Sequence, residues 1–127
     1  RKRIDITFDN SAKDGFFHNL HDINKITSRY IFNECKNYSQ NPANPEIDQL
    51  SGRFSVNTGN FGFLVCREIT NKKLILKRTK DLYKQKQEVI LVLEDKEIIE
   101  ILVKIKKGDI HPEEVMLANK IREVILG

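Results

Sequence analysis

The sequence contains no long apolar run, no internal repeat and no low-complexity tract. Its longest purely apolar stretch is residues 89–93, far short of the roughly 20 residues that a membrane-spanning helix requires. The chain opens with Arg1-Lys2-Arg3, and no apolar segment follows that could act as a signal peptide. We therefore expect no membrane partner and a cytoplasmic location.

Cysteine is scarce as well. Cys35 and Cys66 are the two cysteines, neither belongs to a CxxC pair, and no His/Cys spacing is typical of zinc. This usage favours a reduced, intracellular protein with buried thiols rather than a disulfide or a nucleophile. His18 and His21 have the i, i+3 spacing of a helical metal site, but no third ligand accompanies them, so we expect surface residues.

The bulk composition bounds the size and class of the protein. With 127 residues, 39% hydrophobic and 31% charged, residues 1–127 form one ordinary domain that can fill one core. Because the chain lacks an initiator Met, we expect it to be a fragment of a larger protein. The formal net charge of +4 suits a polyanionic partner without establishing one.

Strands are indicated by the hydrophobic pattern. Polar and apolar residues alternate over residues 3–8, which predicts a half-buried strand. Stretches rich in aromatic and β-branched residues predict further strands at residues 30–38, 61–69 and 88–93. The last of these is almost wholly apolar, as in a strand that is covered on both faces.

Helical signals lie between and after these strands. We expect helices within residues 10–26, from Asn44-Pro45 onward, at 71–86, at 95–105 and from Pro112 to the end, with residues 105–127 as a helical extension. Strands and helices interleave, so the class is α/β, a sheet flanked by helices. The first two strands can pair in either direction.

A pair of charged residues stands in the second predicted strand. Side chains two apart on a strand share a face, so Glu34 and Lys36 project together while Cys35 points to the opposite face. Ionised Glu and Lys side chains among apolar residues are costly to bury unless they pair with an opposite charge or bind a metal. Asp5 is the acid in the middle of the first strand, on its polar face. If these two strands are neighbours, Asp5 and Glu34 can converge on one cation.

That combination suits phosphodiester hydrolysis. A divalent ion both neutralises charge on the phosphate and produces hydroxide at neutral pH. Mg²⁺ prefers hard oxygen ligands, often one or two carboxylates with waters and phosphate oxygens. The backbone carbonyl of Cys35 is a further candidate ligand. Lys36 would orient the attacking water or stabilise the developing charge.

These residues lead to a resemblance. "RKRID" followed by "YIFNECKNYS" resembles the motif of the PD-(D/E)XK nuclease superfamily, in which an Asp is followed, across a variable gap, by Glu-x-Lys. The downstream segments "EIDQLSGRFS", "GFLVCRE" and "EVILVLEDKEI" match the expected order of helix and strands. The set, which covers residues 1 to about 102, is most similar to the restriction-endonuclease-like branch with Mrr-type enzymes and Holliday-junction resolvases.

The resemblance implies a restriction-endonuclease-like mixed β-sheet of about four strands flanked by helices. It implies a Mg²⁺-dependent deoxyribonuclease, in which Mn²⁺ can substitute, acting in prokaryotic restriction, phage defence or DNA repair. Asp5 and Glu34 would be metal ligands, Lys36 the catalytic lysine, and Gln49 a polar residue near the active site. The motif's proline is absent, since Arg3-Ile4 precede Asp5. Many members also carry an acidic residue on an earlier helix, which this chain begins too late to contain.

DNA would then be the substrate and partner. The residues expected to contact it are Arg3, Asn37, Tyr38, Arg53, Arg67, Lys73 and Lys77. Phosphate contacts by such residues are sensitive to salt. The alternatives are that the basic stretch of residues 72–86 is a solvated outer face, and that Asn37 and Tyr38 merely pack.

Three further alternatives remain open. Asp5 could pair with Arg3 or Lys36 in a surface network, with Glu34 and Lys36 as a solvated edge-strand pair. A nuclease-like domain could bind nucleic acid or a partner protein without cutting. Finally, the last helix could cover another domain or a second chain in a homodimer, instead of packing in the core. Its apolar stripe comprises Leu117, Ala118, Ile121, Val124 and Ile125.

Overall fold

The computed structural model describes residues 3–36 and 44–127, apart from the side chains at positions 3–5, 8, 36, 44 and 45. Its strands are β1 (Arg3–Asp9), β2 (Tyr30–Lys36), β3 (Phe61–Cys66) and β4 (Val89–Glu94). Its helices are α1 (Gly15–Asp22), α2 (Asn44–Ser51), α3 (Lys72–Lys86), α4 (Asp95–Lys106) and α5 (Pro112–Leu126). The order of strands and helices is the predicted one.

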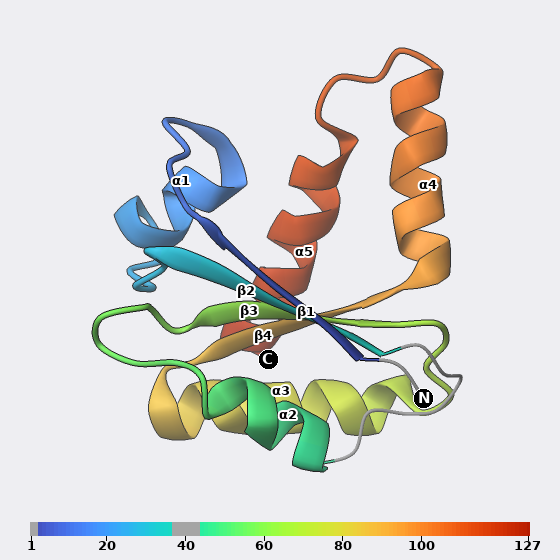
Figure 1. The fold of residues 1–127 in the computed structure, drawn as a ribbon. Coiled ribbons are helices and arrows are strands. Elements are labelled where there is room, and N and C mark those ends of the chain that lie inside the picture. Colours follow the sequence, from blue (N-terminus) through green and yellow to red (C-terminus); the bar gives the residue numbers. More distant parts are fainter. Residues whose placement is uncertain (1–2, 37–43) are drawn as a thin grey trace.

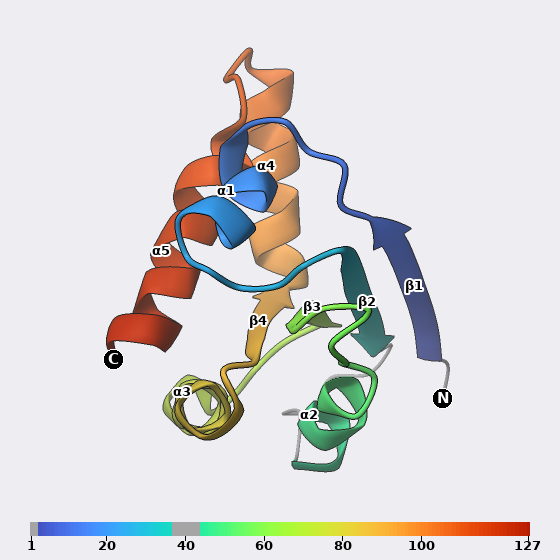
Figure 2. The same ribbon diagram turned by 90° about the vertical axis from the view of Figure 1, so that its left-hand side faces the viewer.

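The four strands form one mixed sheet in the order β1-β2-β3-β4. β1 runs antiparallel to β2, whereas β2, β3 and β4 are parallel to one another. Helices α2 and α3 lie on one side of the sheet, and α1, α4 and α5 lie on the other (Figures 1 and 2). The α/β class and the mixed sheet of about four strands flanked by helices are therefore confirmed.

Two apolar clusters fill the space on the two sides of the sheet. The side of α1 and α5 buries Phe16, Leu20, Ile26, Ile31, Phe61, Phe63, Val89, Leu91, Leu117, Ile121 and Val124. The side of α2 and α3 buries Phe32, Ile47, Leu50, Phe54, Leu64, Cys66, Ile69, Ile75, Leu82, Ile90 and Val92. β4 contributes to both clusters, which agrees with the prediction of a strand covered on both faces. The stripe of α5 supplies core residues.

Several boundaries differ from the sequence prediction. β3 ends at Cys66 rather than at residue 69, because the chain turns away before Ile69. The predicted helix of residues 95–105 is α4, whose N-cap is Glu94, and Glu94 forms a capping box with Glu97. β1 is an edge strand, and its Ile6 is 49% exposed, so the apolar side of this strand is less covered than expected.

The entry into α1 also differs. The N-cap is Asp14, and Asn10, at the start of the predicted segment 10–26, lies outside the helix. The amide of Asn10 instead donates to the carbonyl of Phe17 at 2.9 Å and to the hydroxyl of Ser28 at 3.2 Å. Asn10 therefore ties the segment after β1 to the loop before β2.

The helices have the lengths of ordinary domain helices. Within residues 3–36 and 44–127, no helix is both long and apolar enough to cross a membrane.

Candidate active site

The backbone register brings the predicted acidic positions together. In the antiparallel pair of β1 and β2, Asp5 stands opposite Glu34, and Arg3 stands opposite Lys36. Residues directly opposite in such a pair have Cβ atoms about 4.5–5.5 Å apart. The side chains of Arg3, Asp5 and Lys36 lie outside the described part of the structure, whereas their backbones are described.

Glu34 is completely buried, with 0% of its surface exposed. β2 lies between β1 and β3, and its register pairs Glu34 with Leu64. Glu34 therefore faces the side of the sheet that α2 and α3 cover, among the apolar residues of that cluster. The alternative of a solvated edge-strand pair is wrong for Glu34. A carboxylate in such surroundings must be hydrogen-bonded, paired or bound to a cation to be tolerated.

Arg53 lies over the same face of the sheet, in the loop that follows α2. Its guanidinium donates to the hydroxyl of Thr7 at 3.0 Å and lies 4.9 Å from the ring centroid of Phe32. Phe32 and Glu34 share one face of β2, because they are two residues apart. The described contacts of Arg53 thus join the loop after α2 to β1 and β2, a structural role that the sequence did not indicate.

Gln49 lies on α2, and its side chain is exposed. The residues that α2 turns toward the sheet are Ile47 and Leu50, which are buried. Gln49 thus belongs to the outer surface of α2, and its role near the active site stays a prediction.

The predicted DNA contacts fall in several places. Arg67 is exposed directly after β3, and its carbonyl accepts the amide of Asp95 at 3.4 Å. Lys73 is exposed in the first turn of α3, whereas Lys77 forms an ion pair with Asp81 at 3.1 Å. Arg67 and Lys73 lie near the carboxyl end of the parallel strands, where β2 ends at Lys36. Asn37 and Tyr38 lie outside the described residues.

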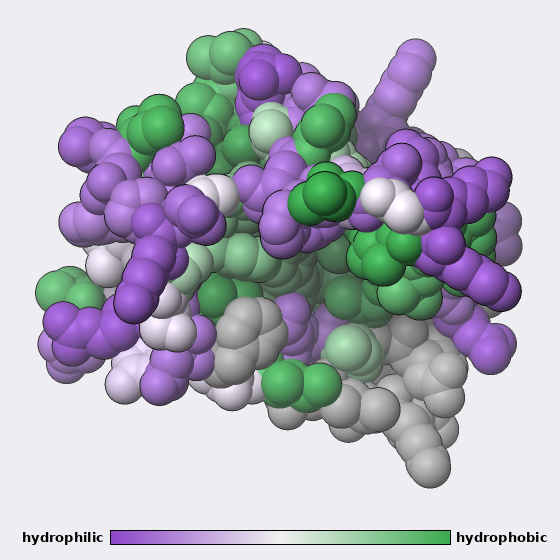
Figure 3. Space-filling view, turned by 90° about the horizontal axis from the view of Figure 1, so that it is seen from above, coloured by the Kyte–Doolittle hydropathy of each residue, from purple (hydrophilic) through white to green (hydrophobic). Residues whose placement is uncertain are grey.

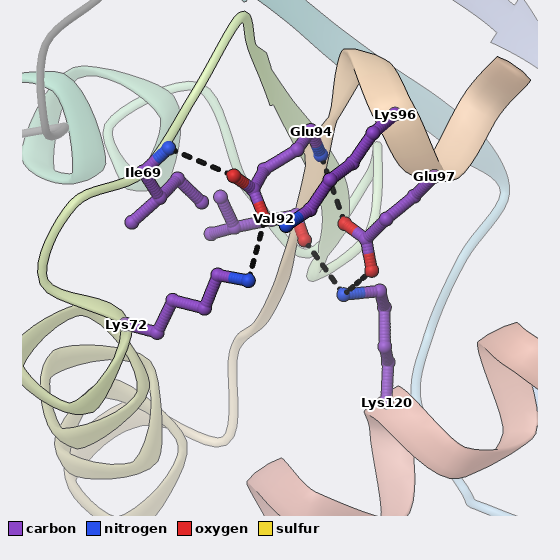
Figure 4. A network of polar contacts seen from close by, with 7 residues as sticks. All are labelled: Ile69, Lys72, Val92, Glu94, Lys96, Glu97 and Lys120. Atoms are coloured by element: carbon purple, nitrogen blue, oxygen red, sulfur yellow. Dashed lines mark hydrogen bonds and ion pairs between the residues drawn. The ribbon is translucent and has the colours of Figure 1, made fainter.

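The structure adds a polar network at this end of the sheet (Figure 4). Glu94, 3% exposed, accepts the amide of Ile69 at 2.9 Å and forms an ion pair with Lys72 at 3.1 Å. Its own amide donates to Glu97 at 2.9 Å, and Glu97 forms an ion pair with Lys120 at 2.8 Å. The network joins β4, α3, α4 and α5.

Glu94 and Lys36 lie at the same level of the sheet, on β4 and β2, with one strand between them. The register pairs Lys36 with Cys66, and Cys66 with Glu94. The sequence signal for this site was present: an acidic residue ends an otherwise apolar strand. The predicted strand ended at residue 93 and the predicted helix began at residue 95, so Glu94 belonged to neither.

The electrostatics of Glu94 favour its ionised form. Burial raises the pKa of this carboxyl, but the hydrogen bond from the Ile69 amide and the neighbouring Lys72 act in the opposite direction and outweigh it. The net result is a pKa below the ordinary value of 4.5. The carboxylate is therefore a fixed negative charge two strands away from Lys36, at the same level of the sheet.

The cysteines lie on opposite sides of the sheet. Cys35 pairs with Val65, whereas Cys66 pairs with Lys36, one position along. Both are thiols; Cys66 is buried and Cys35 is half-buried. The expectation of thiols rather than a disulfide is confirmed, although Cys35 is less buried than expected.

Oxygen donors at positions 5 and 34 are of the chemical type that Mg²⁺ prefers. Among the side chains that the structure describes, no group of three or more His, Cys, Asp or Glu residues could hold a metal ion. The side chain of Asp5 is not among them. A cation at this place would therefore be held by few protein ligands, as is common for Mg²⁺ sites.

Comparison with known proteins gives no relative. No family model matches the chain, no curated protein is similar to it, and no solved structure matches it.

Proposed function

We propose that this chain is a metal-dependent DNA endonuclease domain of the restriction-endonuclease-like type. The observation that carries the proposal is the register of β1 and β2, in which Asp5 stands opposite the fully buried Glu34. Lys36 follows two residues later on the same strand. This arrangement has the acidic and basic residues of the PD-(D/E)XK motif on adjacent strands, in the order that the motif requires.

The proposed reaction is hydrolysis of a phosphodiester bond. Asp5 and Glu34 would hold Mg²⁺ or Mn²⁺, and the Cys35 carbonyl is a further candidate ligand. The bound cation supplies charge neutralisation and a water with a lowered pKa. Lys36 orients that water and donates a hydrogen bond to the oxygen on which negative charge develops. In the net reaction the water oxygen would bond to phosphorus and lose one proton to solvent, while the bond from phosphorus to the leaving oxygen would break and that oxygen would take up a proton from solvent.

The surroundings of Glu34 support this chemistry. Apolar neighbours lower the local dielectric constant, and electrostatic interactions with a cation or a phosphate are stronger there than in water. Two exposed basic side chains at the carboxyl ends of the parallel strands, Arg67 and Lys73, can bind phosphates of the substrate.

A plasmid-cleavage assay tests the proposal. Supercoiled DNA is incubated with the chain and Mg²⁺, with and without a chelator, for the wild type, Glu34→Gln and Lys36→Ala. We expect metal-dependent cleavage that falls at least about 100-fold in each variant, as when one transition-state contact is removed. Matched controls are Glu123→Gln and Lys13→Ala, whose side chains are exposed. Circular dichroism checks that each variant is folded.

Two outcomes would oppose the proposal. If Glu34→Gln and Lys36→Ala cut DNA as well as the wild type, these residues are not catalytic. If the wild type binds DNA but never cuts it, the second candidate function holds: a nuclease-like domain that only binds nucleic acid. The exposed basic residues on α3 favour that candidate, because binding of phosphates by lysine needs no metal.

A further inference from the structure

Helix α4 exposes an apolar face. None of its 12 residues, all of which the structure describes, is buried. Ile99 is 58% exposed, Leu102 59% and Val103 45%. Their i, i+3, i+4 spacing places them on one side of the helix. Apolar (green) side chains stand among polar ones on the face from which α4 and α5 rise (Figure 3).

The two ends of this face carry opposite charges. Asp95 lies four residues before Ile99, and Lys106 lies four residues after Leu102, so both continue the same side of α4. Both side chains are exposed. Among the ion pairs between described residues, neither Asp95 nor Lys106 takes part. The face is thus acidic at one end, apolar in the middle and basic at the other end.

We propose that α4 packs antiparallel against α4 of a second copy of this chain. A two-fold axis between residues 100 and 101 brings Ile99 of one copy against Leu102 of the other. The same axis brings Asp95 of each copy against Lys106 of the other. Such a contact is isologous, because the same surface is used by both copies.

The charge pattern favours a second, antiparallel copy of α4 as the partner of this face. A parallel arrangement would set Asp95 against Asp95 and Lys106 against Lys106, which repel one another. The antiparallel arrangement pairs opposite charges at both ends and also opposes the two helix dipoles favourably. An unrelated partner would need to match this order of charges, whereas a second copy matches it by symmetry.

The contact is small. A helix of 12 residues is about 18 Å long at about 1.5 Å per residue, so α4 alone provides less than the roughly 800 Å² per subunit of a standard interface. Ile110 and Val115, 84% and 68% exposed beyond the end of α4, can extend it. We therefore expect a dimer that dissociates on dilution.

Sedimentation equilibrium over a range of concentrations tests the proposal. The wild type is expected to follow a monomer–dimer equilibrium. Leu102→Glu removes a buried contact from each half of the interface, so the dissociation constant rises at least about tenfold. Val56→Glu is the matched control, because Val56 is 94% exposed and lies outside α4. Circular dichroism confirms that both variants are folded.

Charge reversal tests the antiparallel direction. Asp95→Lys sets two lysines together at each end of the contact, and Lys106→Asp sets two aspartates together, so each variant by itself should dimerise less well than the wild type. A mixture of the two variants should form heterodimers, because each lysine then meets an aspartate. A wild type that stays monomeric at every concentration overturns the proposal. The proposal is also overturned if the Leu102→Glu variant dimerises as well as the wild type, or if the mixture of the two charge variants forms no heterodimers.

Discussion

Glu94 is a single side chain that holds together the backbone near the candidate site. Its carboxylate accepts the Ile69 amide and pairs with Lys72, so it holds the segment between β3 and α3 against β4. Glu94→Ala should lower the free energy of unfolding by about 1.5–3 kcal/mol, the usual value of a hydrogen bond to a charged group. Urea unfolding measures this change. Glu100→Ala, in an exposed pair with Lys104, is the control, and equal losses in both variants would contradict the role of Glu94.

Glu94 should also make the stability of the fold depend on pH, with lower stability at acidic pH. The pKa of Glu94 is lower in the folded chain than its ordinary value of 4.5. Its contribution to stability is therefore complete above about pH 4.5 and is lost as the pH falls through the folded-state pKa. The difference in unfolding free energy between the wild type and Glu94→Ala should shrink in that acidic range. A difference that stays constant down to lower pH would contradict the lowered pKa.

At this scale the sequence predicts residue types better than residue contacts. Strand alternation placed Glu34 on one face with Lys36, but its complete burial depends on the positions of α2 and α3. Arg53 was expected to contact DNA. Its described contacts are with Phe32 and Thr7, and Thr7 lies 46 positions away in the chain. No local pattern contains information about a contact over that separation.

At the level of elements, α1 depends on a residue from α5. Asp14 makes no side-chain cap for α1. Instead, both carboxylate oxygens of Glu114 accept the amide of Phe16, at 2.8 and 3.0 Å. Gly15 has a φ of +80°, and a Cβ there would lie 2.8 Å from Glu114. The capping contact therefore also requires a glycine at this position.

Glu114→Ala should remove this cap and destabilise the chain by about 0.5–2 kcal/mol, as other lost N-caps do. Amide exchange should become faster in α1 than in the sheet, because α1 loses the contact that holds its first turn. Glu123→Ala, an exposed residue of the same helix, is the control. If the two variants unfold at the same denaturant concentration, the cap has no energetic role.

The elements themselves followed from local signals. Apolar periodicity and Pro112 at the start of α5 acted as the sequence indicated, and the helix predicted at 71–86 is α3, with Asn71 as its N-cap. Element ends were less predictable. Ile69 looked like part of β3 because it is apolar, yet it is buried in the turn that follows and donates its amide to Glu94. A buried turn residue and a strand residue have the same hydrophobicity.

For the whole molecule, the topology decides which residues meet. The sequence left the direction of β1 relative to β2 open, because the connection between them permits both. The antiparallel pairing sets Asp5 opposite Glu34, and the parallel pairing of the other strands brings the ends of β2, β3 and β4 to one edge. The exposed face of α4 is likewise a property of the assembled fold, since an apolar stripe alone does not reveal whether it is covered.

The central claim is that Asp5 and Glu34 hold one divalent cation, and titration calorimetry with Mn²⁺ tests it most directly. We expect one ion per chain in the wild type, displaced by excess Mg²⁺, and binding at least about tenfold weaker in Asp5→Asn and Glu34→Gln, as expected when a charged ligand is lost. Asp9→Asn, an exposed carboxylate at the end of the same strand, should bind like the wild type. Mn²⁺ binding that is unchanged in Asp5→Asn would contradict the account.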